Sequence, residues 1–148
     1  MRPDQVAGIG VRVGALLLDQ LLVGAVMAAA AAVLVVRGGA SGPGALLVPG
    51  VLGLLVGLGQ WVAEARTGAT LGSRLLGIRT LSARTGRPAG LLAILLRQVV
   101  LGAGALALYV GIYVVAASGT WDTSPSRRGW HDKAAGTMVL RATAAPVG

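Results

Sequence analysis

The sequence contains no cysteine and no phenylalanine, and only five of its 148 residues are acidic. Without cysteine the chain cannot form a disulfide, a Cys-ligated zinc site, a thiol nucleophile or an iron–sulfur cluster. Charged residues make up 12% of the chain, whereas a soluble domain usually has about 25%. This scarcity of charge argues against an ordinary soluble fold.

The residues that are present are mainly small and apolar. Hydrophobic residues make up 55% of the chain, and there are 24 glycines. Membrane helices tolerate glycine and pack through small side chains. The composition therefore predicts an integral membrane protein, and the length predicts a single domain over residues 1–148.

Three long apolar runs, at about residues 13–36, 45–65 and 91–118, predict the membrane-spanning segments. A spanning helix needs about 20 residues, so each of the first two runs predicts one span. The third run is too long for one upright span and short for two. It is either a single tilted span or a segment that returns to the same side, by crossing twice or as a broken, re-entrant hairpin that bends near Gly102 and Gly104.

The connecting segments predict the orientation. The loop at 66–90 carries five arginines and no acidic residue, which places it in the cytoplasm by the positive-inside rule. The N-terminus then also lies in the cytoplasm. The tail after residue 120 is basic as well, so we expect it on the same side, and this favours the re-entrant alternative for 91–118.

Local patterns add detail to the loop and the tail. Leu71, Leu75 and Ile78 share one helical face, which predicts a short interfacial helix, and the stretch IRTLSARTGRP predicts a strand or hairpin. In the tail, we expect a helix from Ser124-Pro125 to Gly136, followed by a strand in TMVL. The expected fold is thus an all-α membrane bundle of three to four spans with a basic cytoplasmic loop.

The net charge of +8 does not indicate a nucleic-acid-binding protein. The basic residues lie between apolar runs, where they orient the chain and meet anionic lipid headgroups, rather than forming one basic stripe. We therefore interpret four loop residues as lipid-facing, namely Arg74, Arg79, Arg84 and Arg87. Nothing in the sequence indicates a cofactor, a metal site or the nucleophile–base pair of an enzyme.

Three motifs in order resemble the RDD family of small bacterial membrane proteins. The family is named for one arginine and two aspartates. In the stretch RVGALLLD, Arg12 and Asp19 match the arginine and the first aspartate, and in RRGWHDKAAGTMVL, Asp132 matches the second aspartate. The loop sequence ATLGSRLLGIRT is similar to a third family segment, although Ser73 stands where a basic residue is frequent. The resemblance covers about residues 8–142 and implies a multi-pass protein of the bacterial plasma membrane. It leaves the activity undefined, because most members have no defined activity, although cation–proton exchange is attributed to at least one member.

The charged residues of the apolar runs suggest a site on the inner side of the membrane. Asp19 follows Arg12 by two helical turns, about 10 Å along the axis, which is too far for a direct ion pair. A charged aspartate in the bilayer is costly, so each residue needs another partner. Our hypothesis is one ligand- or ion-binding cluster of five residues, Arg12, Asp19, Glu64, Arg97 and Asp132.

This hypothesis leaves two alternatives for the charged residues. They either fix the architecture, with Arg12 holding the tail through Asp132, or they handle a cation or proton. Two functions match these alternatives. The first is a small transporter, which we expect to form a homo-oligomer because a few spans enclose little of a transport pathway. The second is a membrane adaptor. The adaptor would bind a protein partner through its Arg-rich loop and tail.

Overall fold

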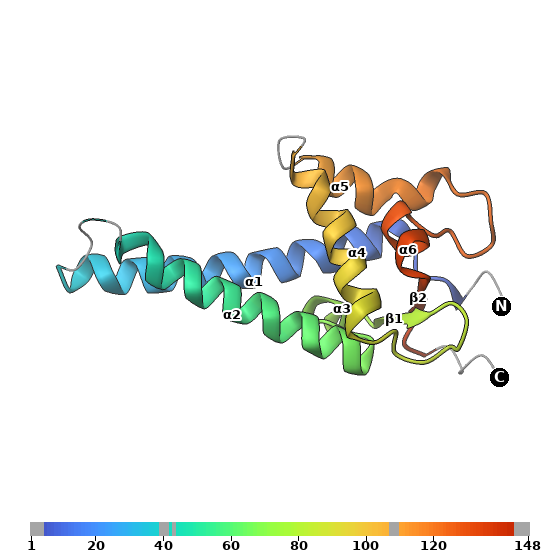
Figure 1. The fold of residues 1–148 in the computed structure, drawn as a ribbon, viewed down its shortest axis with the longest axis horizontal. Helices are drawn as coiled ribbons and strands as arrows, with labels where there is room; N and C mark the ends of the chain where they lie inside the picture. Colours follow the sequence, from blue (N-terminus) through green and yellow to red (C-terminus); the bar gives the residue numbers. More distant parts are fainter. Residues whose placement is uncertain (1–4, 39–41, 43, 107–109, 144–148) are drawn as a thin grey trace.

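The computed structural model describes residues 5–38, 42, 44–106 and 110–143. Helices α1 (Ile9–Val36) and α2 (Gly44–Thr67) pack against each other and form a long arm, which Figure 1 shows projecting from the rest of the molecule. At 1.5 Å per residue the two helices are about 42 and 36 Å long, more than the roughly 30 Å of a bilayer core. Large apolar side chains on the arm are exposed, for example Leu21 at 67% and Leu46 at 81%.

The third apolar segment forms two short helices instead of one long one. It contains α4 (Leu91–Ala103), the 3-10 turn η2 (Gly104–Leu106), α5 (Val110–Ala117) and the 3-10 turn η3 (Ser118–Trp121). The 13 residues of α4 extend about 20 Å, so α4 does not reach across a bilayer. The continuous helix that a single tilted span requires is therefore not formed. The described residues contain two helices of spanning length, α1 and α2, together with shorter apolar helices in the third segment.

A glycine contact explains the break between α4 and α5. A Cβ atom placed on Gly104 would lie 2.6 Å from the backbone carbonyl carbon of Gly111, so only glycine permits this approach. The bend falls where the sequence predicted it. Helix α4 packs against α2, and α5 packs against α1 and runs toward the end of the molecule where α6 lies (Figure 1).

The remaining elements gather at the end of the arm opposite the connection between α1 and α2, and we call this part the base (Figure 1). They are α3 (Leu71–Leu75), β1 (Ile78–Ser82), α6 (Trp130–Ala135) and β2 (Thr137–Arg141). The two strands pair antiparallel, with Ile78 opposite Arg141 and Ser82 opposite Thr137. The other edge of β2 is covered by Val6, so an N-terminal residue extends the sheet.

The base has a small apolar core that attaches the sheet to the arm. Ala15 of α1 packs with Ala7, Ile78 and Val139, and all four are buried. The alternation along β1 follows from this packing, because Ile78 and Thr80 face inward while Arg79 is exposed. The core therefore brings the N-terminus, the loop and the tail together around the start of α1.

Some local expectations need correction. Helix α3 ends at Leu75, and Ile78 lies in β1 rather than on the same helical face. The strand predicted in IRTLSARTGRP exists, but its regular partner is β2. The local hairpin is limited to one bridge between Leu81 and Pro88.

The tail helix is shorter than the sequence suggested. It begins at Trp130 instead of near Ser124, because the carboxylate of Asp132 accepts the backbone N–H of Gly129 and caps the helix there. Its end at Gly136, which has a φ of 64°, and the strand that follows are as predicted.

Candidate functional site

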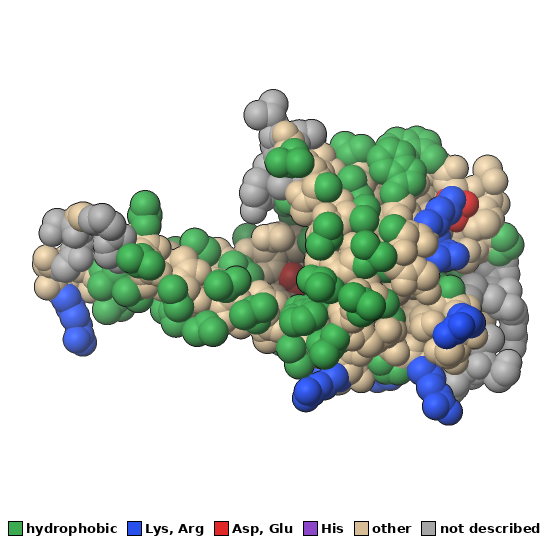
Figure 2. All heavy atoms as spheres, viewed as in Figure 1, with side chains coloured by type: hydrophobic (Ala, Val, Ile, Leu, Met, Phe, Trp, Pro, Cys, Tyr) green, Lys and Arg blue, Asp and Glu red, His purple; other side chains and the backbone are tan. Residues whose placement is uncertain are grey.

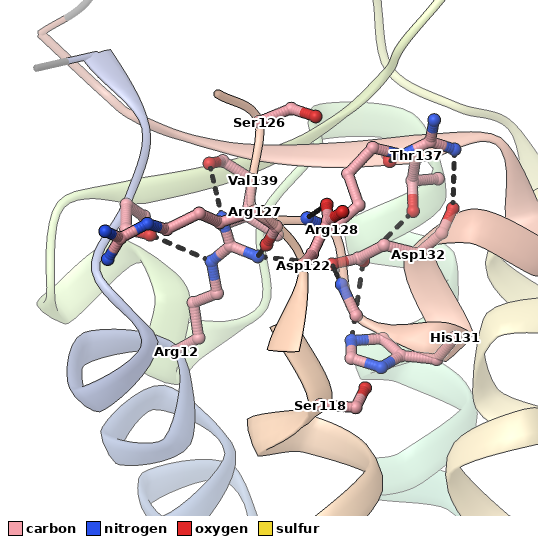
Figure 3. Close-up of polar contacts among 12 residues, drawn as sticks. Arg12, Ser118, Asp122, Ser126, Arg127, Arg128, His131, Asp132, Thr137 and Val139 are labelled. Carbon is pink, nitrogen blue, oxygen red and sulfur yellow. Dashed lines mark hydrogen bonds and ion pairs between the residues drawn. The ribbon is translucent and has the colours of Figure 1, made fainter. Parts of the chain in front are cut away.

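Arg12, at the start of α1, contacts four other segments at the base: the residues before α1, the residues before α6, α6 itself and β2 (Figure 3). Its Nε donates to the carbonyl of Ala7 at 3.0 Å, and its Nη1 donates to the carbonyl of Arg127 at 2.9 Å. Nη2 donates to the carbonyl of Val139 at 3.4 Å, and Nη1 also lies 3.3 Å from Oδ2 of Asp132. The planar guanidinium offers five N–H donors in fixed directions, which suits this role. The predicted contact between Arg12 and Asp132 is present.

Asp132 is the centre of the buried charges. Its side chain is 0% exposed, and Oδ1 accepts from Nε of Arg97 at 3.1 Å and from the hydroxyl of Thr137 at 3.2 Å. Its position follows from local sequence, because as the third residue of α6 it also caps the amide of Gly129. The carboxylate thus holds α6, α4 and β2 together.

The network continues to the end of α2. Nη1 of Arg97 lies 2.8 Å from Oε1 of Glu64, and Nε2 of Gln98 donates to Oε2 of Glu64 at 3.2 Å. Glu64 is 1% exposed. We call Arg12, Asp132, Arg97 and Glu64 the base network; with two positive and two negative side chains it is formally neutral.

Two arginines of the tail contribute contacts that the sequence did not suggest. The carbonyl of Arg127, a residue with a φ of 40°, accepts from Arg12. The side chain of Arg128 donates to the carbonyls of Thr137 at 2.8 Å and Asp132 at 3.1 Å. Every residue has a backbone carbonyl, so the residue types in the sequence do not indicate which carbonyls accept these hydrogen bonds.

The groups around Asp132 have shifted pKa values. Burial alone would raise the pKa of the Asp132 carboxyl, but the guanidinium of Arg97 and the other positive neighbours hold it below its ordinary range. Burial, followed by the charge of Arg97, lowers the pKa of His131 to about 4. The neutral His131 ring donates from Nδ1 to the carbonyl of Val115 at 3.1 Å. The hydroxyl of Ser124 is the main cause of a lowered pKa at Asp122.

Among the described residues, Asp19 shares no hydrogen bond or ion pair with the base network, so the five predicted residues do not form one set of direct contacts, although the charge of Asp19 acts on Arg97. Its Oδ2 accepts from the hydroxyl of Thr70 at 2.6 Å, and its Oδ1 accepts from the backbone N–H of Gly72 at 2.7 Å. Both donors belong to the start of α3. A Cβ on Gly72 would collide with the carbonyl oxygen of Ala15, so glycine is needed for α3 to approach α1 this closely.

Asp19 lines a cavity of about 490 Å³ between α1, α2 and α4, which we call the Asp19 cavity. Figure 2 shows a recess where the arm meets the rest of the molecule, with acidic atoms inside it. Most of its wall is apolar, and Asp19 is the only acidic residue among those that line it. The other polar lining residues are Gln20, Gln60, Thr70 and Gln98.

The four basic loop residues interpreted as lipid-facing lie on the surface of the base. All of them are exposed: Arg74, Arg79, Arg84 and Arg87. None of the four joins the base network. Their exposure is compatible with contacts to lipid headgroups or to a protein.

Two long apolar helices with exposed leucines, together with a charged base, are typical of a helical membrane protein. The chain belongs to the RDD family, whose model matches residues 6–136. Neither the curated proteins nor the solved structures include a match to this chain. The family assignment agrees with the resemblance carried by Arg12, Asp19 and Asp132.

Proposed function

We propose that this RDD-family protein is a small transporter of the bacterial plasma membrane that exchanges a cation for a proton at Asp19. The observation that supports this most is a carboxylate in an otherwise mainly apolar cavity between the two arm helices and α4. Ionisable residues within membrane segments are costly and usually mark an ion or proton pathway.

The base network is a poorer candidate for this exchange. Its acidic and basic groups are matched in number, and Asp132 and Glu64 already accept from Arg97. Among the described residues, no buried side-chain nitrogen or oxygen lacks a hydrogen-bond partner. Releasing one member would leave a buried charge without compensation, at a cost of about 3–5 kcal/mol. We therefore assign the base network to architecture.

Asp19 has the capacity to bind an ion. An ionised carboxylate offers about four lone-pair sites, and in the described part of the chain two protein donors contact this one. Amide oxygens in the same cavity can replace part of the hydration shell of a cation. Gln98 donates its Nε2 to Glu64, which leaves its Oε1 without a donor among the described residues. In this scheme a proton arriving at Asp19 neutralises the carboxylate and releases the cation.

The orientation that goes with this function places both termini and the Arg-rich loop in the cytoplasm. The support is the positive-inside rule together with the pairing of Val6 with Leu140 of β2, which places the start of the described chain beside the tail at the base. We further propose a homo-oligomer, since two long helices of one chain enclose little of a pathway.

Asp19→Asn is the test of this function. Asparagine can still accept from the N–H of Gly72 through Oδ1, and its NH₂ group can donate to the hydroxyl of Thr70, which in turn donates to Ser73. The fold should therefore persist, but asparagine can neither carry a negative charge nor take up a proton. In proteoliposomes with an internal pH dye, we expect the wild type to move protons when a sodium or potassium gradient is applied, and Asp19→Asn to be inactive. The matched control is Asp122→Asn, an acid of the tail that contacts Ser124 and Lys133 and should leave flux unchanged. Normal flux in Asp19→Asn would show that the assignment is wrong.

A membrane adaptor is the second candidate, favoured by the exposed arginines of the loop. It predicts no flux in the pure protein and co-purification of a partner that is lost when Arg79, Arg84 and Arg87 are replaced together. Flux by the purified protein alone would make this role unnecessary.

A further inference from the structure

Arg74 and Arg79 line a second cavity of about 490 Å³ at the foot of α2, which we call the basic cavity. Its wall combines the end of α2, helix α3, strand β1 and the residue after β2. The lining residues are Thr67, Ala69, Arg74, Ile78, Arg79 and Ala142, and none of them is acidic.

The two guanidinium groups have unused donors. Arg74 donates once, from Nη2 to the hydroxyl of Thr67 at 3.1 Å. Arg79 donates from its side chain to no other described residue. Each guanidinium has five N–H donors and forms its strongest contacts with phosphate and carboxylate oxygens. The basic cavity is therefore electropositive, and most N–H donors of its two guanidinium groups have no hydrogen-bond acceptor among the described residues.

Ordered backbone holds these arginines in place. Arg74 belongs to α3, whose first turn is bonded to Asp19 through Gly72. Arg79 lies in β1, where the amide of the next residue, Thr80, donates to the carbonyl of Gly68 at 2.6 Å. Both arginines thus extend from elements whose backbone is fixed on the arm and the sheet.

An apolar groove leads out of the basic cavity. This groove has a volume of about 240 Å³, runs along α2 and shares Ala69 and Arg74 with the basic cavity. Its other lining residues are Val56, Gly59, Gln60, Ala63 and Leu71. A Cβ on Gly59 would meet no atom within 4 Å, so the groove is open there. Val56 lies within the apolar part of α2, so the groove extends toward the membrane-spanning part of the arm.

We infer that the basic cavity and this groove form a binding site for one anionic phospholipid. The phosphate would occupy the basic cavity between Arg74 and Arg79, and an acyl chain would lie along α2 in the groove. A free phosphate would use the same two arginines but would leave the groove empty. The groove therefore favours a lipid over a free phosphate.

The test is calorimetric titration of the full-length protein in maltoside detergent. The probes are dioctanoyl phosphatidylglycerol and inorganic phosphate. We expect saturable binding of the lipid, weakened by about tenfold or more in the double variant Arg74→Gln, Arg79→Gln, because its charge-assisted contacts are lost. The matched control, Arg84→Gln with Arg87→Gln, removes two exposed arginines of the same loop that do not line the cavity, and should change binding by less than about twofold.

Gly59→Leu separates the two sources of phosphate. Leucine at this exposed helical position should fill the groove, weaken lipid binding and leave the affinity for inorganic phosphate unchanged. If the control pair weakens binding as much as Arg74→Gln with Arg79→Gln, the attraction is a general effect of charge and the site is refuted. If inorganic phosphate binds as tightly as the lipid and Gly59→Leu has no effect, the lipid assignment is wrong. Absence of saturable lipid binding overturns the proposal.

Discussion

Replacing Asp132 with asparagine is expected to lower the free energy of unfolding by about 3–5 kcal/mol, the usual cost of breaking a buried ion pair by removing one partner. The substitution leaves the guanidiniums of Arg12 and Arg97 in the base without their shared carboxylate. The NH₂ group of the new asparagine would also face N–H donors, either those of Arg12 or those of Arg97. The measurement is the unfolding midpoint of the purified protein in mixed micelles, monitored by tryptophan fluorescence.

The control for this variant is Lys133→Gln, which changes a charge at the next residue of the same helix. The side chain of Lys133 is 52% exposed and pairs with Asp122 on the surface, so we expect a loss below about 1 kcal/mol. Equal stabilities for Asp132→Asn and the wild type would contradict the structural role of the base network.

The second large effect is expected for Arg97→Met. Arg97, on α4, pairs with the buried acids Glu64 of α2 and Asp132 of α6 and so joins the three helices. Without it, two carboxylates in the base lose a positive partner, and we again expect a loss of about 3–5 kcal/mol in the same unfolding measurement.

A second substitution should rescue much of this loss. In the double variant Arg97→Met, Glu64→Met, the uncompensated carboxylate of Glu64 is gone and two apolar side chains of similar volume face each other. Replacing a buried ion pair in this way is often neutral, and Asp132 keeps its contact with Arg12. A double variant that is less stable than Arg97→Met alone would contradict the account.

The sequence predicted the long elements and the link between the chain ends for identifiable reasons. Long apolar runs with few polar residues indicated α1 and α2, and Gly102 with Gly104 indicated the break in the third segment. The contact of Arg12 with Asp132 followed from the charge of the loop and tail, which placed both residues on one side of the membrane, and from the family resemblance.

The environment of Asp19 was not predictable in the same way. Its donors, Thr70 and Gly72, are 51 and 53 residues away in the sequence. One donor is a hydroxyl and the other is a backbone amide, so a search of the sequence for charged residues does not identify either of them. The available signal was the cap of α3, because Thr70 precedes LGSRL and accepts the amide of Ser73. If Thr70 is interpreted as a helix cap, the sequence predicts α3 but not the approach of α3 to α1.

The central claim is that the tail packs at the base on the side of the Arg-rich loop, opposite the tip of the arm. The most direct test uses single cysteines in this cysteine-free chain and an impermeant thiol reagent applied to intact and opened cells. Ser126→Cys reports the tail, Thr85→Cys the loop, and Arg37→Cys the tip of the arm. The account predicts that the cysteines at 126 and 85 react only after the membrane is opened, while the one at 37 reacts in intact cells. If the cysteine at 126 reacts in the same preparation as the one at 37, the tail lies on the other side, and the contact of Arg12 with Asp132 cannot exist in the membrane.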